Sequence, residues 1–221
     1  LLAVGFVFSI AAVTAWITVL VVAFDRGGAG AAGLAVVVQL VPTALLAPVV
    51  TAAGDRFPRH LVLSVGFAVL AASATGIAVS LASSANLWVV LLLGAVYTVA
   101  LESTPATVAS LLVRHARTPT QLMQWNVTQS FARTAGSLIG PLLTSALLVI
   151  AGPSWVFAVL AVMCASTAVG IAVRLPPDDR TNSTTGLRMV LRASADGIAY
   201  VATTPGPRRV IAFIAASGLL I

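Results

Sequence analysis

The sequence predicts an all-α, polytopic membrane protein: a six-transmembrane-helix bundle, a cytoplasmic amphipathic linker helix and the start of a seventh helix. Hydrophobic residues make up 59% of the 221 residues and charged residues only 8%, whereas about 25% of a soluble domain is charged. Apolar runs reach about 20 residues, the length that crosses a hydrocarbon core. The charges gather between these runs. Together these observations argue against an ordinary soluble protein.

Six apolar runs follow one another, and each ends at a polar turn or a group of charges. A three-residue turn, Ala151-Gly152-Pro153, is enough to separate the last two. The single cysteine, Cys164, excludes a disulfide scaffold and a multi-cysteine metal site. We expect neither a metal nor a cofactor. The predicted spans are residues 1–24, 31–53, 61–82, 87–113, 121–150 and 154–173.

These spans define the expected domains. Residues 1–175 would form the six-helix transmembrane domain. Residues 176–209 form a polar linker whose apolar side chains recur at helical spacing, which predicts an amphipathic helix at the membrane surface or a solvated helical connector. Residues 210–221 are apolar but too short to cross. We therefore expect the start of a seventh helix, and a chain that continues beyond it.

The arginines indicate how the spans are oriented. Cytoplasmic loops of membrane proteins carry an excess of Lys and Arg. Loops after the first, third and fifth spans hold Arg26 alone, which predicts a cytoplasmic N-terminus and a cytoplasmic linker. Membrane topology thus explains the formal net charge of +6 without nucleic acid as a partner. The loops after the second, fourth and sixth spans hold Arg56, Arg59, Arg114, Arg117, Arg174, Arg180, Arg188, Arg192, Arg208 and Arg209.

Two charges, Glu102 and Arg133, fall inside the predicted spans. Each costs roughly 2.5–3.5 kcal/mol on insertion scales, so such residues are candidates for function. They lie at similar depth on the two arms of one predicted helical hairpin. They could form an ion pair that only holds two helices together. Alternatively, one or both could line a polar cavity that contacts substrate or carries a proton.

Uncharged polar side chains lie near these two charges. Asn126, Gln129 and Ser130 share a helical stripe with Arg133 in the fifth span, and Gln39 lies in the second. The third and sixth spans carry neither an amide nor a charge. We therefore expect the second, fourth and fifth spans to face inward and the third and sixth to face lipid. The candidates for substrate contact or proton coupling are Glu102, Arg133, Gln39, Asn126 and Gln129.

Two glycines, Gly136 and Gly140, stand four residues apart in the fifth span and precede Pro141. Small residues at this spacing let helix backbones approach each other closely. We expect these three residues to form a helix-packing motif.

The loop between the second and third spans carries a recognisable motif. Its residues 54–60, Gly-Asp-Arg-Phe-Pro-Arg-His, resemble the Gly-x-x-x-Asp-Arg-x-x-Arg-Arg signature of the major facilitator superfamily. Gly136-x-x-x-Gly140-Pro141 resembles the antiporter motif in the fifth helix of that family. The stretch from Thr104 to Leu112 and residues 121–141 are similar to the branch that contains macrolide and enterobactin exporters.

The resemblance implies the N-terminal half of a twelve-helix secondary transporter. It implies a small, drug-like or siderophore-like substrate, and a C-terminal six-helix half that rocks against the first. Gly54, Asp55, Arg56 and Arg59 would form a conformational-gating motif rather than touch substrate. The fourth-helix arginine that the family ties to proton coupling is missing, so Glu102 becomes the candidate if protons are a partner.

Other functions remain to be compared with transport. A transporter-like anchor or sensor for a soluble module beyond residue 221 is the alternative. Half of an ABC exporter does not fit, because the loops are too short and a chain without lysine has no phosphate-binding motif. An intramembrane serine protease needs a histidine at membrane depth, whereas His60 and His115 lie in loops. The composition indicates a bacterial plasma membrane, and no enzyme is expected.

Overall fold

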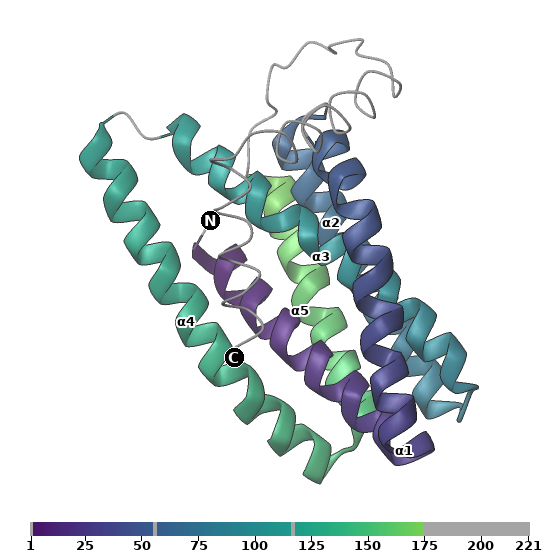
Figure 1. The fold of residues 1–221 in the computed structure, drawn as a ribbon. Coiled ribbons are helices and arrows are strands. Elements are labelled where there is room, and N and C mark those ends of the chain that lie inside the picture. The colour runs from purple at the N-terminus through teal and green to yellow at the C-terminus, as the bar shows by residue number, and fades with distance from the viewer. Residues whose placement is uncertain (1, 55–56, 116–117, 175–221) are drawn as a thin grey trace, which may run out of the picture. The chain divides into compact units, whose positions relative to one another are not determined.

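Five α-helices account for almost all the residues that the computed structural model describes, which are 2–54, 57–115 and 118–174 (Figure 1). The last four match the predicted spans from residue 61 onward to within a few residues at each end. The predicted linker 176–209 and seventh-helix start 210–221 lie outside the described residues. The helices are α1 (Leu2–Gly54), α2 (Arg59–Ala82), α3 (Leu87–His115), α4 (Pro119–Ile150) and α5 (Pro153–Arg174).

The first two predicted spans are joined in the single helix α1. Its 53 residues would extend about 80 Å if they were straight. The helix is broken at Gly28, whose φ of 67° and ψ of −162° are not helical. Val19 and Gln39 both lie beside Gly94 of α3, because a Cβ built on Gly94 would be 3.8 Å from each of their side chains. In a straight helix, the 20 residues between them would span about 30 Å. The chain therefore folds back at Gly28, between a first arm (residues 2–27) and a second arm (residues 29–54).

A hydrogen bond ties this bend to another turn of the chain. The Arg26 guanidinium donates to the carbonyl oxygen of Ala85 at 2.6 Å, and Ala85 lies in the turn between α2 and α3. The bend after the first arm and the turn after α2 consequently lie at the same end of the helices, as alternating spans require.

The core is built around α2 and α5, which pack along each other. Phe67 of α2 and Phe157 of α5 are completely buried, and the Ser64 hydroxyl of α2 donates to the Ala168 carbonyl of α5 at 3.4 Å. The expectation that these two spans face lipid is wrong for this side of each, whereas Val65 of α2 and Val162 of α5 are exposed on other sides. The expectation failed on this side because apolar residues suit the core and lipid equally well, so hydrophobicity alone does not separate the two faces.

Helix α3 joins this core to α1, because it packs along both α2 and α1, and α1 in turn packs along α4. Of the five helices, α4 buries the smallest share of its apolar length, and Phe131, Leu138 and Leu142 are exposed on it. Every helix of the described part is long and apolar enough to cross a membrane. The predicted inward face of α4 is therefore confined to the side that meets α1 and α3.

Candidate functional site

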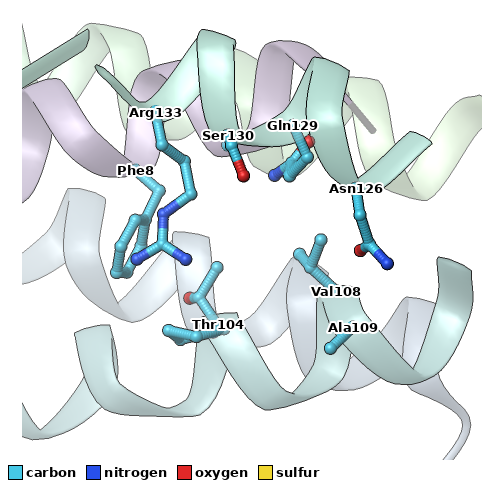
Figure 2. Close-up of a pocket in the computed structure, with 10 residues that line it drawn as sticks. Phe8, Thr104, Val108, Ala109, Asn126, Gln129, Ser130 and Arg133 are labelled. Carbon is cyan, nitrogen blue, oxygen red and sulfur yellow. The ribbon is translucent and has the colours of Figure 1, made fainter. Parts of the chain in front are cut away.

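A polar pocket of about 130 Å³ lies between the first arm of α1, helix α3 and helix α4 (Figure 2). Figure 2 shows the α4 side chains directed across the pocket toward Thr104, Val108 and Ala109 of α3. The pocket is smaller than the about 300–1,000 Å³ of typical small-molecule sites. It therefore suits one functional group of a ligand better than a whole drug-sized molecule. Its lining residues are Gly5, Phe8, Thr104, Pro105, Val108, Ala109, Asn126, Gln129, Ser130 and Arg133.

All four polar residues of the stripe on α4, Asn126, Gln129, Ser130 and Arg133, line this one pocket. They come together because positions three and four apart in a helix share a face. Asn126, Ser130 and Arg133 are exposed, whereas only 8% of Gln129 is exposed. The pocket thus has a buried amide near its middle and accessible polar groups on either side along the helix.

The Gln129 amide lies against Gly5 of the first arm, where a Cβ in place of the glycine hydrogen would overlap it. Its Oε1 atom is buried and accepts no hydrogen bond from the residues that the structure describes. Buried polar atoms without a partner are rare in folded proteins. Gln129 Oε1 is therefore an acceptor that a donor entering the pocket could use.

The guanidinium of Arg133 lies over the ring of Phe8, 5.4 Å from the ring centroid. Such a cation–π contact contributes about 0.5–1 kcal/mol at exposed sites and more where water is excluded. Between the described residues, no ion pair joins Arg133 to Glu102. The predicted hairpin allowed an ion pair between Arg133 and Glu102. In the structure, Arg133 instead contacts Phe8 of α1.

The packing of α4 explains this difference. Helix α4 lies along α1 and makes few contacts with α3. A Cβ on Gly136 would lie 2.7 Å from the Phe6 carbonyl oxygen, and one on Gly140 would lie 3.5 Å from Thr14 Oγ1. The Thr14 hydroxyl donates to the Gly140 carbonyl at 3.3 Å. The glycines thus let α4 approach the first arm of α1 rather than α3.

Glu102 and Gln39 lie away from the pocket lining. Glu102 is exposed on α3. Gln39 is 2% exposed, on the second arm of α1. Its Oε1 lies 3.2 Å from the Thr98 hydroxyl of α3, which shares its hydrogen between Gln39 and the Gly94 carbonyl at 2.8 Å. The Gln39 Nε2 donates to the Ala35 carbonyl at 3.3 Å. The sequence candidates therefore divide into a pocket group, Asn126, Gln129 and Arg133, and these two others.

The loop motif is described only in part. Gly54 ends α1, and Arg59 begins α2 with a half-buried side chain. Asp55 and Arg56 lie outside the described residues. In the part of the chain with described side chains, no cluster of three or more His, Cys, Asp or Glu could hold a metal ion.

Sequence reasoning did not find the contribution of the first arm of α1 to the pocket. Gly5 and Phe8 belong to an uninterrupted apolar run, where neither residue differs from its neighbours in any pattern. Thr104 stands out in the sequence only within the stretch that resembles a branch of the family. Its neighbour Pro105 is a proline inside α3 and also lines the pocket. A proline inside an apolar span is the local feature of the sequence that could have pointed to this α3 wall of the pocket.

The arrangement of apolar helices around a polar pocket agrees with a comparison against protein families. A model of the Major Facilitator Superfamily matches residues 1–220. No match was found among curated proteins. The match covers nearly the whole chain, and the five helices supply the apolar length of a multi-pass membrane protein. This chain therefore belongs to the Major Facilitator Superfamily and is a membrane transporter of that kind.

Proposed function

We propose that the protein exports a small, drug-like or siderophore-like organic molecule by alternating access, and that the pocket of α1, α3 and α4 is part of its substrate site. The observation that carries this proposal is the pocket itself. It gathers an arginine, two amides and two hydroxyl side chains inside a unit whose helices are apolar enough to cross a membrane. Ionisable side chains at membrane depth, such as Arg133, are rare and commonly mark substrate or ion pathways.

The proposed topology has six crossings, two of them supplied by the arms of α1. A C-terminal six-helix half would complete the site from the other side. We place the protein in a bacterial plasma membrane with a cytoplasmic N-terminus. The ten arginines in alternate loops support this orientation. The hydrogen bond from Arg26 to Ala85 supports the placement of the first and third loops at one end.

Two further residue groups have proposed roles away from substrate. Gly54, Asp55, Arg56 and Arg59 would stabilise one gating state, because contacts at a loop can shift a two-state equilibrium by a few kcal/mol. Gly136, Gly140 and Pro141 would hold α4 against α1. The close approach of Gly136 to the Phe6 carbonyl supports this packing role.

We assign proton coupling, if the carrier uses protons, to Glu102. It is the single acidic residue within the predicted spans, and it lies exposed on α3 outside the described pocket lining. A Glu102→Gln variant should then lose uptake into inverted vesicles driven by a proton gradient but retain exchange of labelled for unlabelled substrate. Loss of both activities would assign Glu102 to substrate binding or to folding instead.

Accumulation of fluorescent substrates in cells that express the full-length protein tests the central proposal. Arg133→Gln and Gln129→Ala should raise accumulation to the level of cells without the protein, while both variants still reach the membrane. Ser145→Ala is the matched control, because Ser145 is exposed on the same helix and does not line the pocket. Wild-type cells that accumulate every tested compound as fully as empty cells would favour the sensor alternative.

A further inference from the structure

The charge inside the pocket has one sign. Arg133 is the only ionisable residue among its described lining residues, and none of them is acidic. Its nearest aromatic partner, Phe8, offers a ring face rather than a counter-ion. A guanidinium at membrane depth without a carboxylate favours a ligand that brings the negative charge.

The neighbouring groups define what else that ligand should carry. Gln129 lies four residues before Arg133, which places the two side chains about one helical turn apart on the same face. Its buried Oε1 accepts hydrogen bonds and cannot donate them. A ligand hydroxyl about one turn from the ligand's anionic group would satisfy this atom. Val108 and Ala109 on the facing wall provide apolar surface for the body of the ligand.

We infer that the pocket binds the anionic end of a hydroxylated organic acid, with the carboxylate on Arg133 beside Phe8 and the hydroxyl on Gln129 Oε1. The inference rests on the proposed transport function, since it names the substrate class of that site. An Arg–carboxylate pair is commonly bidentate, which would orient the acid group. Asn126, one turn beyond Gln129, extends the polar wall toward larger members of the same class.

The first test measures the sign of charge that the pocket prefers, without turnover. Ser130→Cys is introduced into full-length protein in which buried Cys164 is replaced by Ala, and the protein is reconstituted in lipid nanodiscs. Two modification rates are measured, one with the anionic reagent sulfonatoethyl methanethiosulfonate and one with its cationic trimethylammonium analogue. The ratio of the anionic to the cationic rate should be higher for this cysteine than for free cysteine. Arg133→Gln should lower this rate ratio by about tenfold. Arg133→Lys should largely preserve it.

Glu102→Gln is the matched control, because it also changes the charge by one but lies outside the described pocket lining. It should leave the ratio within about twofold, as expected for an exposed charge that solvent and salt screen. A rate ratio that stays the same in Arg133→Gln, or that changes as much in Glu102→Gln, would overturn the inference. Such a result would leave transport itself intact, because the accumulation assay measures transport independently.

The second test asks whether the ligand class is right. Meta-hydroxybenzoate, whose carboxylate and hydroxyl are about one helical turn apart, should protect Ser130→Cys from modification. Its neutral amide should protect at least about tenfold less, as expected when a charge-assisted pair is lost. Benzoate, which lacks the hydroxyl, should also protect less, and Gln129→Leu should abolish the difference between benzoate and the hydroxylated acid. Equal protection by acid and amide, or none by the acid, would refute the assignment.

Discussion

Gln39 shows how a single polar residue is accommodated inside the apolar bundle. Its amide is buried, yet both ends have partners: Thr98 Oγ1 donates to Oε1, and Nε2 donates to the Ala35 carbonyl. The first of these bonds joins the second arm of α1 to α3. Gln39 therefore acts as a link between two helices, whereas Gln129, an amide of the same kind, has an acceptor left for a ligand.

Replacing Thr98 by Val keeps the shape of the side chain but removes its hydroxyl, which lies within hydrogen-bond distance of both Gln39 Oε1 and the Gly94 carbonyl of its own helix. We expect a loss of about 0.6 kcal/mol, and at most about 1.7 kcal/mol, in the free energy of unfolding, the range for interhelical hydrogen bonds in membranes. Equilibrium unfolding in mixed micelles would measure it. Thr167→Val is the control, because the Thr167 hydroxyl bonds only to Met163 within its own helix. An equal effect of both substitutions would contradict the link.

At the residue scale, periodicity predicted which residues share a face but not which helix that face meets. The stripe of Asn126, Gln129 and Arg133 follows from spacing along one helix, and the structure places all three in one pocket. The pairing of Glu102 with Arg133 required α3 and α4 to be neighbours. A sequence does not fix that neighbourhood, because the approach of α4 to α1 depends on three-dimensional packing around Gly136.

At the scale of elements, the bend in α1 depends on one glycine. With φ of 67° and ψ of −162°, Gly28 occupies a region that other residues enter at a cost of about 1–3 kcal/mol. We expect Gly28→Ala to destabilise the protein by this amount in thermal or denaturant unfolding. Gly30→Ala should have little effect, since a Cβ there meets no atom within 4 Å and no positive φ is required. Equal stability of the two variants would argue against a strained bend.

The contact between α4 and α1 makes a second prediction of this kind. A Cβ on Gly136 would press on the Phe6 carbonyl at 2.7 Å and on Ser9 at 2.8 Å, so Gly136→Ala should cost about 1–3 kcal/mol, as overpacking does. Gly140→Ala meets its nearest neighbours at 3.5 Å, an ordinary contact distance. It should be tolerated, because alanine favours helix over glycine by about 1 kcal/mol. Unfolding of the two purified variants side by side would test this contrast, and a greater loss from Gly140→Ala would refute it.

The sequence predicted the helices well because their ends carry local signals. Polar turns and prolines interrupt the apolar runs close to where α2 to α5 begin and end. The Thr118 hydroxyl caps α4 by accepting a hydrogen bond from the backbone N–H of Gln121. The bend of α1 was harder to place. Residues 25–30 contain a charged pair and three glycines, which indicated a loop, whereas the chain keeps helical geometry on both sides of Gly28.

For the whole molecule, orientation is the property that can be tested most directly. In a Cys164→Ala background, Ser83→Cys in the turn after α2 should react with a membrane-impermeant maleimide in intact cells. Thr120→Cys, in the first turn of α4, should react only after the cells are opened. Both positions are exposed, so access depends on the side of the membrane. The opposite labelling pattern would invert the proposed topology.

The bend of α1 also bears on how the chain enters the membrane. In the proposed orientation, the tip between the two arms is the part that must cross the bilayer. Its two charged residues, Asp25 and Arg26, carry opposite charges that sum to zero. The membrane potential, worth about 2.3 kcal/mol per elementary charge at 100 mV, therefore does no net work on the tip. Insertion of this helical hairpin would depend on the apolar surface of its two arms and hardly at all on the energised state of the cell.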